Sequence, residues 1–366
     1  MKKRTKRTFS LHHWCGLIAG IFLLAISASG VVLLFEEEID RSIYAQHFTL
    51  TQPAASLKID RSFEKVRLEN PGWEIRIPEL PKTNTEALKY ELRQQTLRKW
   101  IFAHPETGVI LHTDHRAENR LTHTFLLLHY TLFAGTSGKI MVLLCGLAFL
   151  VLTITGLLLY RKSLLKVLLF RQKITLQNRR AFFSGLHRIV GVWSLLFNVL
   201  MSVSGIWLGY LVVENTLKKK DQKIESPAVS VSIDKMLQQV KQANPEFEVT
   251  YLRFPAKEGG AMQLLGHLRS DPVIYGEFYS SLQANSKTGE IEKTDLLKNK
   301  PWNLRLAKML QVLHFGNYAG IGVKILYAFF GLMPGLLSVS GFVIWFYRRR
   351  QQNISVKQPQ PKVKMV

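Results

Sequence analysis

Four histidines stand at matching places in two halves of the sequence, and each introduces a long apolar segment. Two lie in a Leu-His-x-x-x-Gly motif, and two lie in a Leu-His motif that continues with an aromatic residue. They are His12, His187, His129 and His314. Neutral imidazole is a common metal ligand, and two imidazoles on opposite faces of haem iron form a b-type haem site. The sequence therefore predicts a ligand held through imidazoles inside a membrane.

The residues that follow these histidines repeat in register, which indicates an internal duplication. Each histidine is followed, at the same interval in both halves, by a hydroxyl residue and a glycine. The pairs are Ser29-Gly30, Ser204-Gly205, Thr155-Gly156 and Ser340-Gly341. Helix bundles build cofactor sites from inward-facing side chains on different helices. The duplication predicts that the two members of each histidine pair lie at the same depth of a duplicated helix bundle.

Four apolar segments contain no charged residue. They are residues 14–35, 140–160, 189–213 and 325–347. A helix of about 20 residues crosses a hydrocarbon core of ~30 Å. Buried helices of a soluble protein are rarely this long and uninterrupted, so the sequence predicts four transmembrane helices. Pro334 predicts a kink in the last of them.

The net charge of +23 is distributed unevenly along the chain, and its distribution predicts an orientation in the membrane. Basic residues gather before the first apolar segment, between the second and third, and after the fourth; the middle loop, residues 162–183, contains no Asp or Glu. The positive-inside rule places both termini and this loop in the cytoplasm and the two long intervals on the exported side. A nucleic-acid surface does not require this alternation, so we expect no nucleic-acid partner.

The first apolar segment also has features of a signal peptide, namely a basic start and the small residues of Ala25-Ile26-Ser27-Ala28. Its apolar run continues to Phe35, however, which is longer than the apolar region of a typical signal peptide. The same pattern recurs in the third apolar segment, which cannot be a signal peptide. We therefore expect an uncleaved anchor.

The two long intervals repeat as well. In each, a helix-like stretch ends at Asn-Pro, at residues 70–71 and 244–245, because proline restricts the preceding residue and has no amide hydrogen. Alternating apolar residues then predict strands. Thr107-Gly108 and Thr288-Gly289 predict hairpin turns in which glycine takes a positive φ. Each interval is therefore predicted to be a helix packed on a small antiparallel sheet.

The order of these features resembles the PepSY-associated transmembrane family of iron-regulated inner-membrane proteins. The helix, strands and Thr-Gly hairpin of each long interval resemble a PepSY module, and the resemblance runs from about residue 8 to residue 350. It implies an α+β membrane protein: a duplicated four-transmembrane-helix bundle with two exported PepSY-like domains of a helix and an antiparallel sheet. Some members of the family are haem-containing siderophore reductases, and the resemblance implies the bacterial inner membrane.

The sequence predicts nine consecutive segments. They are a basic cytoplasmic N-terminus (1–9), a first transmembrane segment (10–37), a first exported domain (38–120), an interfacial segment with the second transmembrane segment (121–161), a basic cytoplasmic loop (162–183), a third transmembrane segment (184–214), a second exported domain (215–303), an interfacial segment with the fourth transmembrane segment (304–349), and a cytoplasmic tail (350–366). The tail is polar, basic and proline-containing, which predicts disorder on the anionic inner leaflet.

In this topology the four histidines form two pairs, and we expect each pair to supply both axial ligands of one haem b. The pairs are His12 with His187 near the cytoplasmic face, and His129 with His314 near the exported face. Two haems at two depths would carry an electron across the membrane in two steps. A histidine at a membrane boundary is otherwise often an interfacial residue in contact with headgroups. His13, whose counterpart is Arg188, would replace His12 as a ligand if the first helix were rotated.

Three features leave alternatives open. His112 and His115 suggest a metal site, but residues i and i+3 of a strand point to opposite faces, and the alternative is a solvated connection. Glycines in the apolar segments allow either close helix packing or room for a flat porphyrin. Residues 121–133 and 304–315 either continue into the next apolar segments or form separate interfacial helices.

The residues themselves predict only a membrane scaffold of paired imidazoles. No catalytic residue is assigned, because the sequence contains no recognisable triad, zinc-protease helix or phosphate loop. The family resemblance implies a reductase that takes electrons from a cytoplasmic or membrane donor, reduces Fe(III) in an exported ferric siderophore or chelate, and releases Fe(II). The alternative is a non-enzymatic PepSY membrane module that binds or inhibits an exported peptidase or assists an iron-uptake system. The expected partners are the iron chelate, the electron donor and the lipid bilayer.

Overall fold

The computed structural model describes residues 3–218, 224–225 and 229–357, and the chain forms two compact units. The helical unit comprises residues 1–34, 126–217 and 324–366, and the sheet unit comprises residues 35–125 and 218–323. The predicted disordered tail begins within the last helix, and its residues 358–366 lie outside the described residues. Residues 1–2 of the predicted N-terminus and residues 219–223 and 226–228 of the second interval lie outside them as well.

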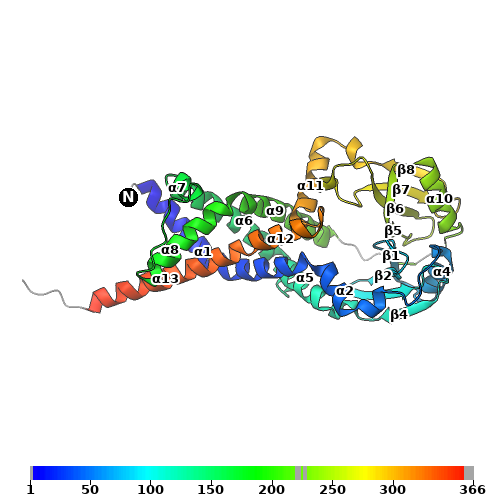
Figure 1. Ribbon diagram of the computed structural model, residues 1–366, viewed down its shortest axis with the longest axis horizontal. Helices are drawn as coiled ribbons and strands as arrows, with labels where there is room; N and C mark the ends of the chain where they lie inside the picture. Colours follow the sequence, from blue (N-terminus) through cyan, green and yellow to red (C-terminus); the bar gives the residue numbers. More distant parts are fainter. Residues whose placement is uncertain (1–2, 219–223, 226–228, 358–366) are drawn as a thin grey trace, which may run out of the picture. The chain divides into compact units, whose positions relative to one another are not determined.

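The helical unit holds the apolar helices (Figure 1). Its elements are α1 (Lys3–Leu33), α6 (Gly135–Tyr160), α7 (Leu164–Leu168), α8 (Arg179–Trp193), α9 (Leu195–Lys218) and α13 (Met333–Lys357), with parts of α5 (Leu121–Thr131) and α12 (Gly320–Gly331). Four stretches are long and apolar enough to cross a membrane. They are Thr5–Leu33, Gly135–Tyr160, Leu195–Lys218 and Gly320–Gln351. Among the described residues, the four predicted segments thus correspond to four helices that could cross a membrane, although the third begins at Leu195 rather than near residue 184.

These helices pack closely on one another and leave their outer faces apolar. Helix α1 packs against α6 and α13, and α8 packs against α13. Glycines lie at the crossings: a Cβ at Gly20 would approach Phe342 to 3.2 Å, and one at Gly146 would approach Ile206 to 3.2 Å. On the outer faces Ile18 is 70% exposed and Leu196 is 84% exposed. Such a surface is stable against hydrocarbon rather than water.

Two of the apolar segments are interrupted, although the sequence indicated continuous spans. The third is divided at Ser194 into α8 and α9, and the Ser194 hydroxyl accepts a hydrogen bond from Asn198 Nδ2 at 2.9 Å. The fourth is divided at Leu332 into α12 and α13. This second interruption lies beside Pro334, where a kink was predicted, because proline has no N–H to donate to the preceding turn.

The segments that precede the second and fourth apolar stretches form separate helices. Helix α5 ends at Thr131, and the chain turns through Leu132 and Phe133, both of which have positive φ, before α6 begins. Helix α11 (Trp302–Phe315) ends at Gly316, which is left-handed with φ of 66°. The broken-helix alternative is therefore the one observed.

The sheet unit contains a single antiparallel sheet of eight strands, in the order β4-β3-β2-β1-β5-β6-β7-β8 (Figure 1). The strands are β1 (Glu74–Ile77), β2 (Leu88–Gln94), β3 (Leu97–Ala103), β4 (Ile110–Asp114), β5 (Phe247–Arg253), β6 (Ala261–Leu268), β7 (Ser280–Asn285) and β8 (Ile291–Asp295). The first four come from one long interval and the last four from the other. They join where β1 pairs with β5, with Ile77 opposite Leu252. The strands assigned to two modules thus share one sheet.

The two intervals of the sheet unit have corresponding parts. Helices α4 (Ile59–Glu69) and α10 (Ile233–Ala243) contribute to one apolar core with both halves of the sheet. The remaining described helices of this unit are α2 (Glu36–Ile43), α3 (Ala45–Phe48), α11 and three short 3₁₀ turns, at 117–119, 273–275 and 297–299. The predicted hairpin glycines, Gly108 and Gly289, have φ of 72° and 78°. The helices and turns predicted for each interval are therefore present.

Helices α4 and α10 cap one another. Asp60 Oδ1 accepts a hydrogen bond from the backbone N–H of Ile233 at 2.7 Å, and Asp234 Oδ1 accepts one from the N–H of Ile59 at 2.7 Å. Carboxylates are favourable at helix N-termini because the first N–H groups lack partners within the helix. Burial, opposed by the Ile59 N–H bond and reinforced by the neighbouring Asp60, raises the pKa of Asp234.

Candidate functional site

The structure brings His12 and His187 together inside the helical unit. His12 lies in α1 and His187 lies in α8, and both side chains are partly buried. Their ring centres are 6.3 Å apart, and the ring planes are nearly perpendicular, at 86°. The predicted proximity of these two residues, which are far apart in the sequence, is therefore observed.

A hydrogen bond from α6 fixes the protonation of the His12 ring. His12 Nδ1 lies 2.9 Å from Thr155 Oγ1, and this hydroxyl donates its own proton to the Val151 carbonyl at 2.6 Å. A hydroxyl has one proton to donate, so Thr155 accepts from Nδ1–H. In the neutral ring the proton is therefore on Nδ1, and Nε2 carries the lone pair that binds metals.

His187 has the equivalent arrangement with α13. Its Nδ1 lies 2.8 Å from Ser340 Oγ, and Ser340 donates to the Leu337 carbonyl at 3.1 Å. The same argument places the proton on Nδ1 and the lone pair on Nε2. Four helices thus contribute to this site: α1 and α8 supply the rings, and α6 and α13 supply the hydroxyls. Partners of this kind fix the tautomer and the ring orientation of a ligating histidine.

The glycine after each hydroxyl residue makes room for the neighbouring ring. A Cβ at Gly156 would lie 3.4 Å from His12 Cε1, and a Cβ at Gly341 would lie 3.8 Å from His187 Cε1. The sequence marked these hydroxyl-glycine pairs only as evidence of duplication. Their contacts with the rings were not recognised, although the repeated spacing was the signal from which they could have been found.

His129, in α5, has the same kind of surroundings in the helical unit. Its Nδ1 lies 2.9 Å from the Ile26 carbonyl and 3.3 Å from Ser29 Oγ. A carbonyl only accepts, so the proton is again on Nδ1. A Cβ at Gly30 would approach His129 Cε1 to 2.9 Å, which is closer than side chains tolerate. A third hydroxyl-glycine pair, Ser29-Gly30, therefore lies against the ring of a third predicted histidine.

The fourth predicted histidine, His314, belongs to the sheet unit, in the last turn of α11. Its ring centre is 6.2 Å from that of Phe315, with the planes at 74°. His129 belongs to the helical unit, so the pairing of these two residues stays a prediction.

His13 lies away from the ring pair. It stacks on Phe9, with ring centres 5.9 Å apart, and it contacts Trp14 edge-on at 5.6 Å. Of the two adjacent histidines, His12 is therefore the one beside His187.

The sheet unit contains a histidine pair that differs from the one considered from sequence. His112 stacks face to face on His47, with ring centres 3.5 Å apart, rather than pairing with His115. Burial and the neighbouring His112 lower the pKa of His47. Stacked rings do not direct their nitrogens at one point, and within the described ranges no group of three or more His, Cys, Asp or Glu side chains could hold a metal ion. His47 was not identified from sequence, since it reaches His112 only through the fold.

Four apolar helices and an antiparallel sheet flanked by helices define this protein as a membrane protein of mixed architecture. A model of the PepSY-associated TM region matches residues 9–348, nearly the whole chain, and the protein therefore belongs to this family. No curated protein matched the chain.

Proposed function

We propose that His12 and His187 are the two axial ligands of a b-type haem. Metal–nitrogen bonds to histidine are about 2 Å long, and the centre of an imidazole lies roughly 1 Å beyond its nitrogen. Two rings on opposite sides of one iron therefore have centres about 6 Å apart. The observed separation of 6.3 Å fits this requirement. It is the observation that carries the proposal.

The chemistry of the donor set also supports a haem. Both rings keep Nε2 for a metal because Nδ1 is bonded to a hydroxyl. A metal ion bound by protein alone usually has four protein ligands. The iron of a haem already has four nitrogen ligands from the macrocycle, so it requires only two from the protein. When bound, haem supplies reversible one-electron chemistry at its iron.

The chain itself would orient this group. Thr155 and Ser340 hold the two rings and make them more basic ligands through the Nδ1–H bonds. Gly156 and Gly341 have no side chains that would crowd the two rings.

We also propose that His129 is a ligand of the second haem predicted from the sequence. Its surroundings support this, because its Nδ1 is bonded in the same way and its ring rests on a hydroxyl-glycine pair. The residues around His314 repeat those around His129 in sequence. The duplicated bundle is inferred from this repetition together with the corresponding halves of the sheet unit.

We further propose that the protein lies in the bacterial inner membrane, with both termini in the cytoplasm and the sheet unit exported as two PepSY-like modules. The charge distribution supports this orientation. In the stretches that make up the helical unit, Glu214 is the one acidic residue, whereas basic residues gather at both chain ends and in the middle loop.

The function that these features support best is transmembrane electron transfer to ferric iron. One electron, received from a cytoplasmic or membrane donor, would reduce one Fe(III) in an exported siderophore or chelate to Fe(II). Chelators with hard oxygen ligands hold Fe(II) less tightly, and the iron would be released. The family resemblance is the reason for proposing a ferric substrate. The paired histidine rings are the physical basis for proposing an electron path.

A visible spectrum tests the proposal. The full chain purified in detergent is expected to be red and to sharpen its bands on reduction with dithionite. His187→Ala should lose the haem of this pair, while His13→Ala, the matched control, should keep it because His13 lies away from the rings. A colourless protein after supplementation with haemin, or equal haem content in the two variants, would contradict the assignment.

A further inference from the structure

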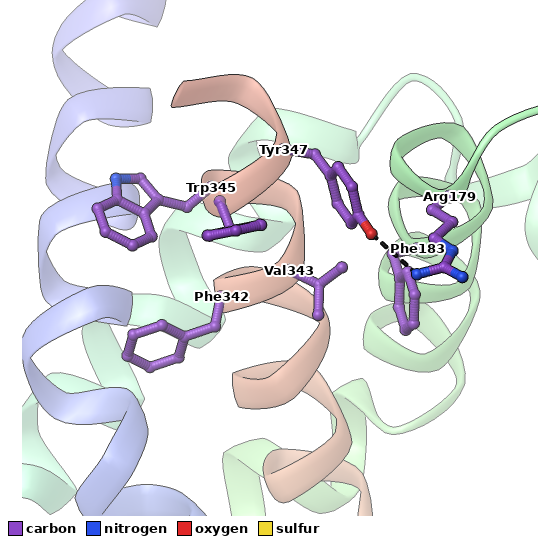
Figure 2. Close-up of a pocket in the computed structure, with 7 residues that line it drawn as sticks. Arg179, Phe183, Phe342, Val343, Trp345 and Tyr347 are labelled. Carbon is purple, nitrogen blue, oxygen red and sulfur yellow. Dashed lines mark hydrogen bonds between the residues drawn. The ribbon is translucent and has the colours of Figure 1, made fainter. Parts of the chain in front are cut away.

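A hollow of about 650 Å³ lies against the end of α13, beside the first turns of α8 (Figure 2). Its walls are almost entirely aromatic or aliphatic. The lining residues are Arg179, Phe183, Phe342, Val343, Trp345, Phe346 and Tyr347. In Figure 2, Phe342 and Trp345 lie on one side of α13, and Tyr347 faces Phe183 and Arg179 on the other.

The hollow opens on a surface that hydrocarbon would cover. Phe346 is 56% exposed, and the hollow lies at the end of a helix that is long and apolar enough to span a membrane. Tyr and Trp are enriched where a membrane helix meets the headgroups, and the sequence continues with Arg348, Arg349 and Arg350. An occupant must therefore be apolar over most of its length and must end near the headgroup level.

Of the residues that line the hollow, Arg179 is the charged one, and Arg180 follows it in the sequence. Arg179 Nη1 donates to the Tyr347 hydroxyl at 3.2 Å, and Arg180 Nη1 donates to Gln351 Oε1 at 2.7 Å. A guanidinium has five N–H donors, so each arginine retains donors for a ligand. The stretches of the helical unit contain one acidic residue, Glu214, which lies near the C-terminal end of α9. Among the described residues of this unit, no acidic side chain lies at this end of the helices beside these guanidinium groups.

We propose that this hollow binds an anionic phospholipid. Its phosphate would contact Arg179 and Arg180, and an acyl chain would lie along Phe183, Phe342 and Phe346. Arginine suits phosphate because its planar fork of N–H groups matches the phosphate oxygens. Basic pockets between membrane helices bind anionic headgroups for the same reason. The combination of an apolar wall and unneutralised cations is what selects this occupant.

The proposed lipid would contact the helices that position His187. Phe183 precedes His187 by four residues, so the two side chains share a face of α8. Val343 follows Ser340, the partner of His187 Nδ1, by three residues on α13. A lipid in the hollow would therefore pack across both helices about one turn from the histidine.

Brominated lipids test this site, because bromine quenches nearby tryptophan and Trp345 lines the hollow. The full chain is placed in nanodiscs of phosphatidylcholine, and brominated phosphatidylglycerol is titrated in. The Trp345 signal is taken as the difference between the wild type and Trp345→Phe. Quenching should saturate at a low mole fraction of phosphatidylglycerol and should need a much higher fraction of brominated phosphatidylcholine.

Charge-matched variants separate the site from general attraction. Arg179→Gln should raise the half-saturating fraction about fivefold, which corresponds to about 1 kcal/mol for one arginine at an anionic headgroup. Arg171→Gln removes the same charge from an exposed residue that does not line the hollow, and it should leave the fraction unchanged. Both side chains are exposed, so neither change should unfold the protein.

Three results would overturn the proposal. One is equal quenching by the two brominated lipids, which would indicate an apolar surface without headgroup selection. Another is an equal effect of the two arginine variants, which would indicate surface charge alone. The third is a competition result in which a short-chain quinone displaces brominated phosphatidylglycerol at a lower mole fraction than unlabelled phosphatidylglycerol does. This result would indicate a site for a flat redox lipid.

Discussion

The helical unit and the sheet unit bury different kinds of side chain. The sheet unit has an apolar core, in which Leu88, Leu92 and Leu264 are fully inaccessible. The helical unit has only a small buried apolar cluster, around Ala19, Leu23 and Cys145, and exposes many of its large apolar side chains. It also buries hydroxyls, among them Ser29, Thr155 and Ser340. These three hydroxyls face histidine rings. The comparison teaches that substitutions in the sheet core should cost stability, whereas substitutions at the buried hydroxyls should cost ligand binding.

The largest expected effect on stability comes from the sheet core. Leu92→Ala should lower the free energy of unfolding of the sheet unit by about 2–5 kcal/mol, because a fully buried leucine leaves a cavity. The haem spectrum should keep its band positions. Thermal unfolding in detergent measures the first effect, and Leu97→Ala, at a residue 47% exposed, is the control with little expected change. If Leu92→Ala lost the haem bands but kept its unfolding temperature, the sheet core would affect ligand binding rather than stability, contrary to this comparison.

Next comes the close approach at Gly30. Gly30→Ala would place a methyl group 2.9 Å from His129 Cε1, so the ring must move, at a cost of about 1–3 kcal/mol. We expect loss of the haem proposed at His129, read from haem content per chain. Gly16→Ala is the matched control on the same helix, because its nearest neighbour would be 3.6 Å away. Equal haem content in the two variants would mean that His129 does not bind the group.

Removal of a hydroxyl should weaken ligand binding with little change in stability. Ser340→Ala removes the acceptor for His187 Nδ1–H, and such partners are worth about 10–100-fold in metal affinity. The reduction potential should rise, because a less basic imidazole stabilises Fe(III) less. Ser338→Ala is the control on the same helix, since the Ser338 hydroxyl donates to the Pro334 carbonyl at 2.9 Å. If a potentiometric titration gives the same reduction potential for both variants, the Ser340 hydroxyl does not tune the ligand.

The smallest expected effect concerns pH and the sheet unit. The pKa of Asp234 is raised in the folded protein, so the protonated form is favoured by folding. Its contribution to stability is therefore fully present below the unfolded pKa and is lost as pH rises through the folded pKa. As pH falls from 7 toward 4, the unfolding temperature of the sheet unit should rise slightly in the wild type relative to that of the Asp234→Asn variant. An identical pH dependence in this variant would contradict the role of Asp234.

The sequence was sufficient for the features that depend on periodicity and repetition. Uninterrupted apolar length identified four membrane helices, and the matched spacing of His12 and His187 anticipated that they meet. Long-range strand pairing was not visible, because the β1–β5 junction depends on two segments distant in sequence. No proline marks the interruption at Ser194, and the nearest glycine, Gly191, lies within α8. The roles of Thr155 and Ser340 needed coordinates, since a buried hydroxyl is as often bonded only to its own helix.

Electron paramagnetic resonance of the oxidised full chain tests the central claim most directly, because it reports the ligands of ferric iron and the angle between their planes. If His12 and His187 hold the haem, its ferric iron would have two imidazole ligands and would give a low-spin signal. His187→Ala should convert that signal to high spin or remove it, while His13→Ala should preserve it. A wild-type protein with no ferric haem signal, or one whose signal is the same in His187→Ala, would contradict the account.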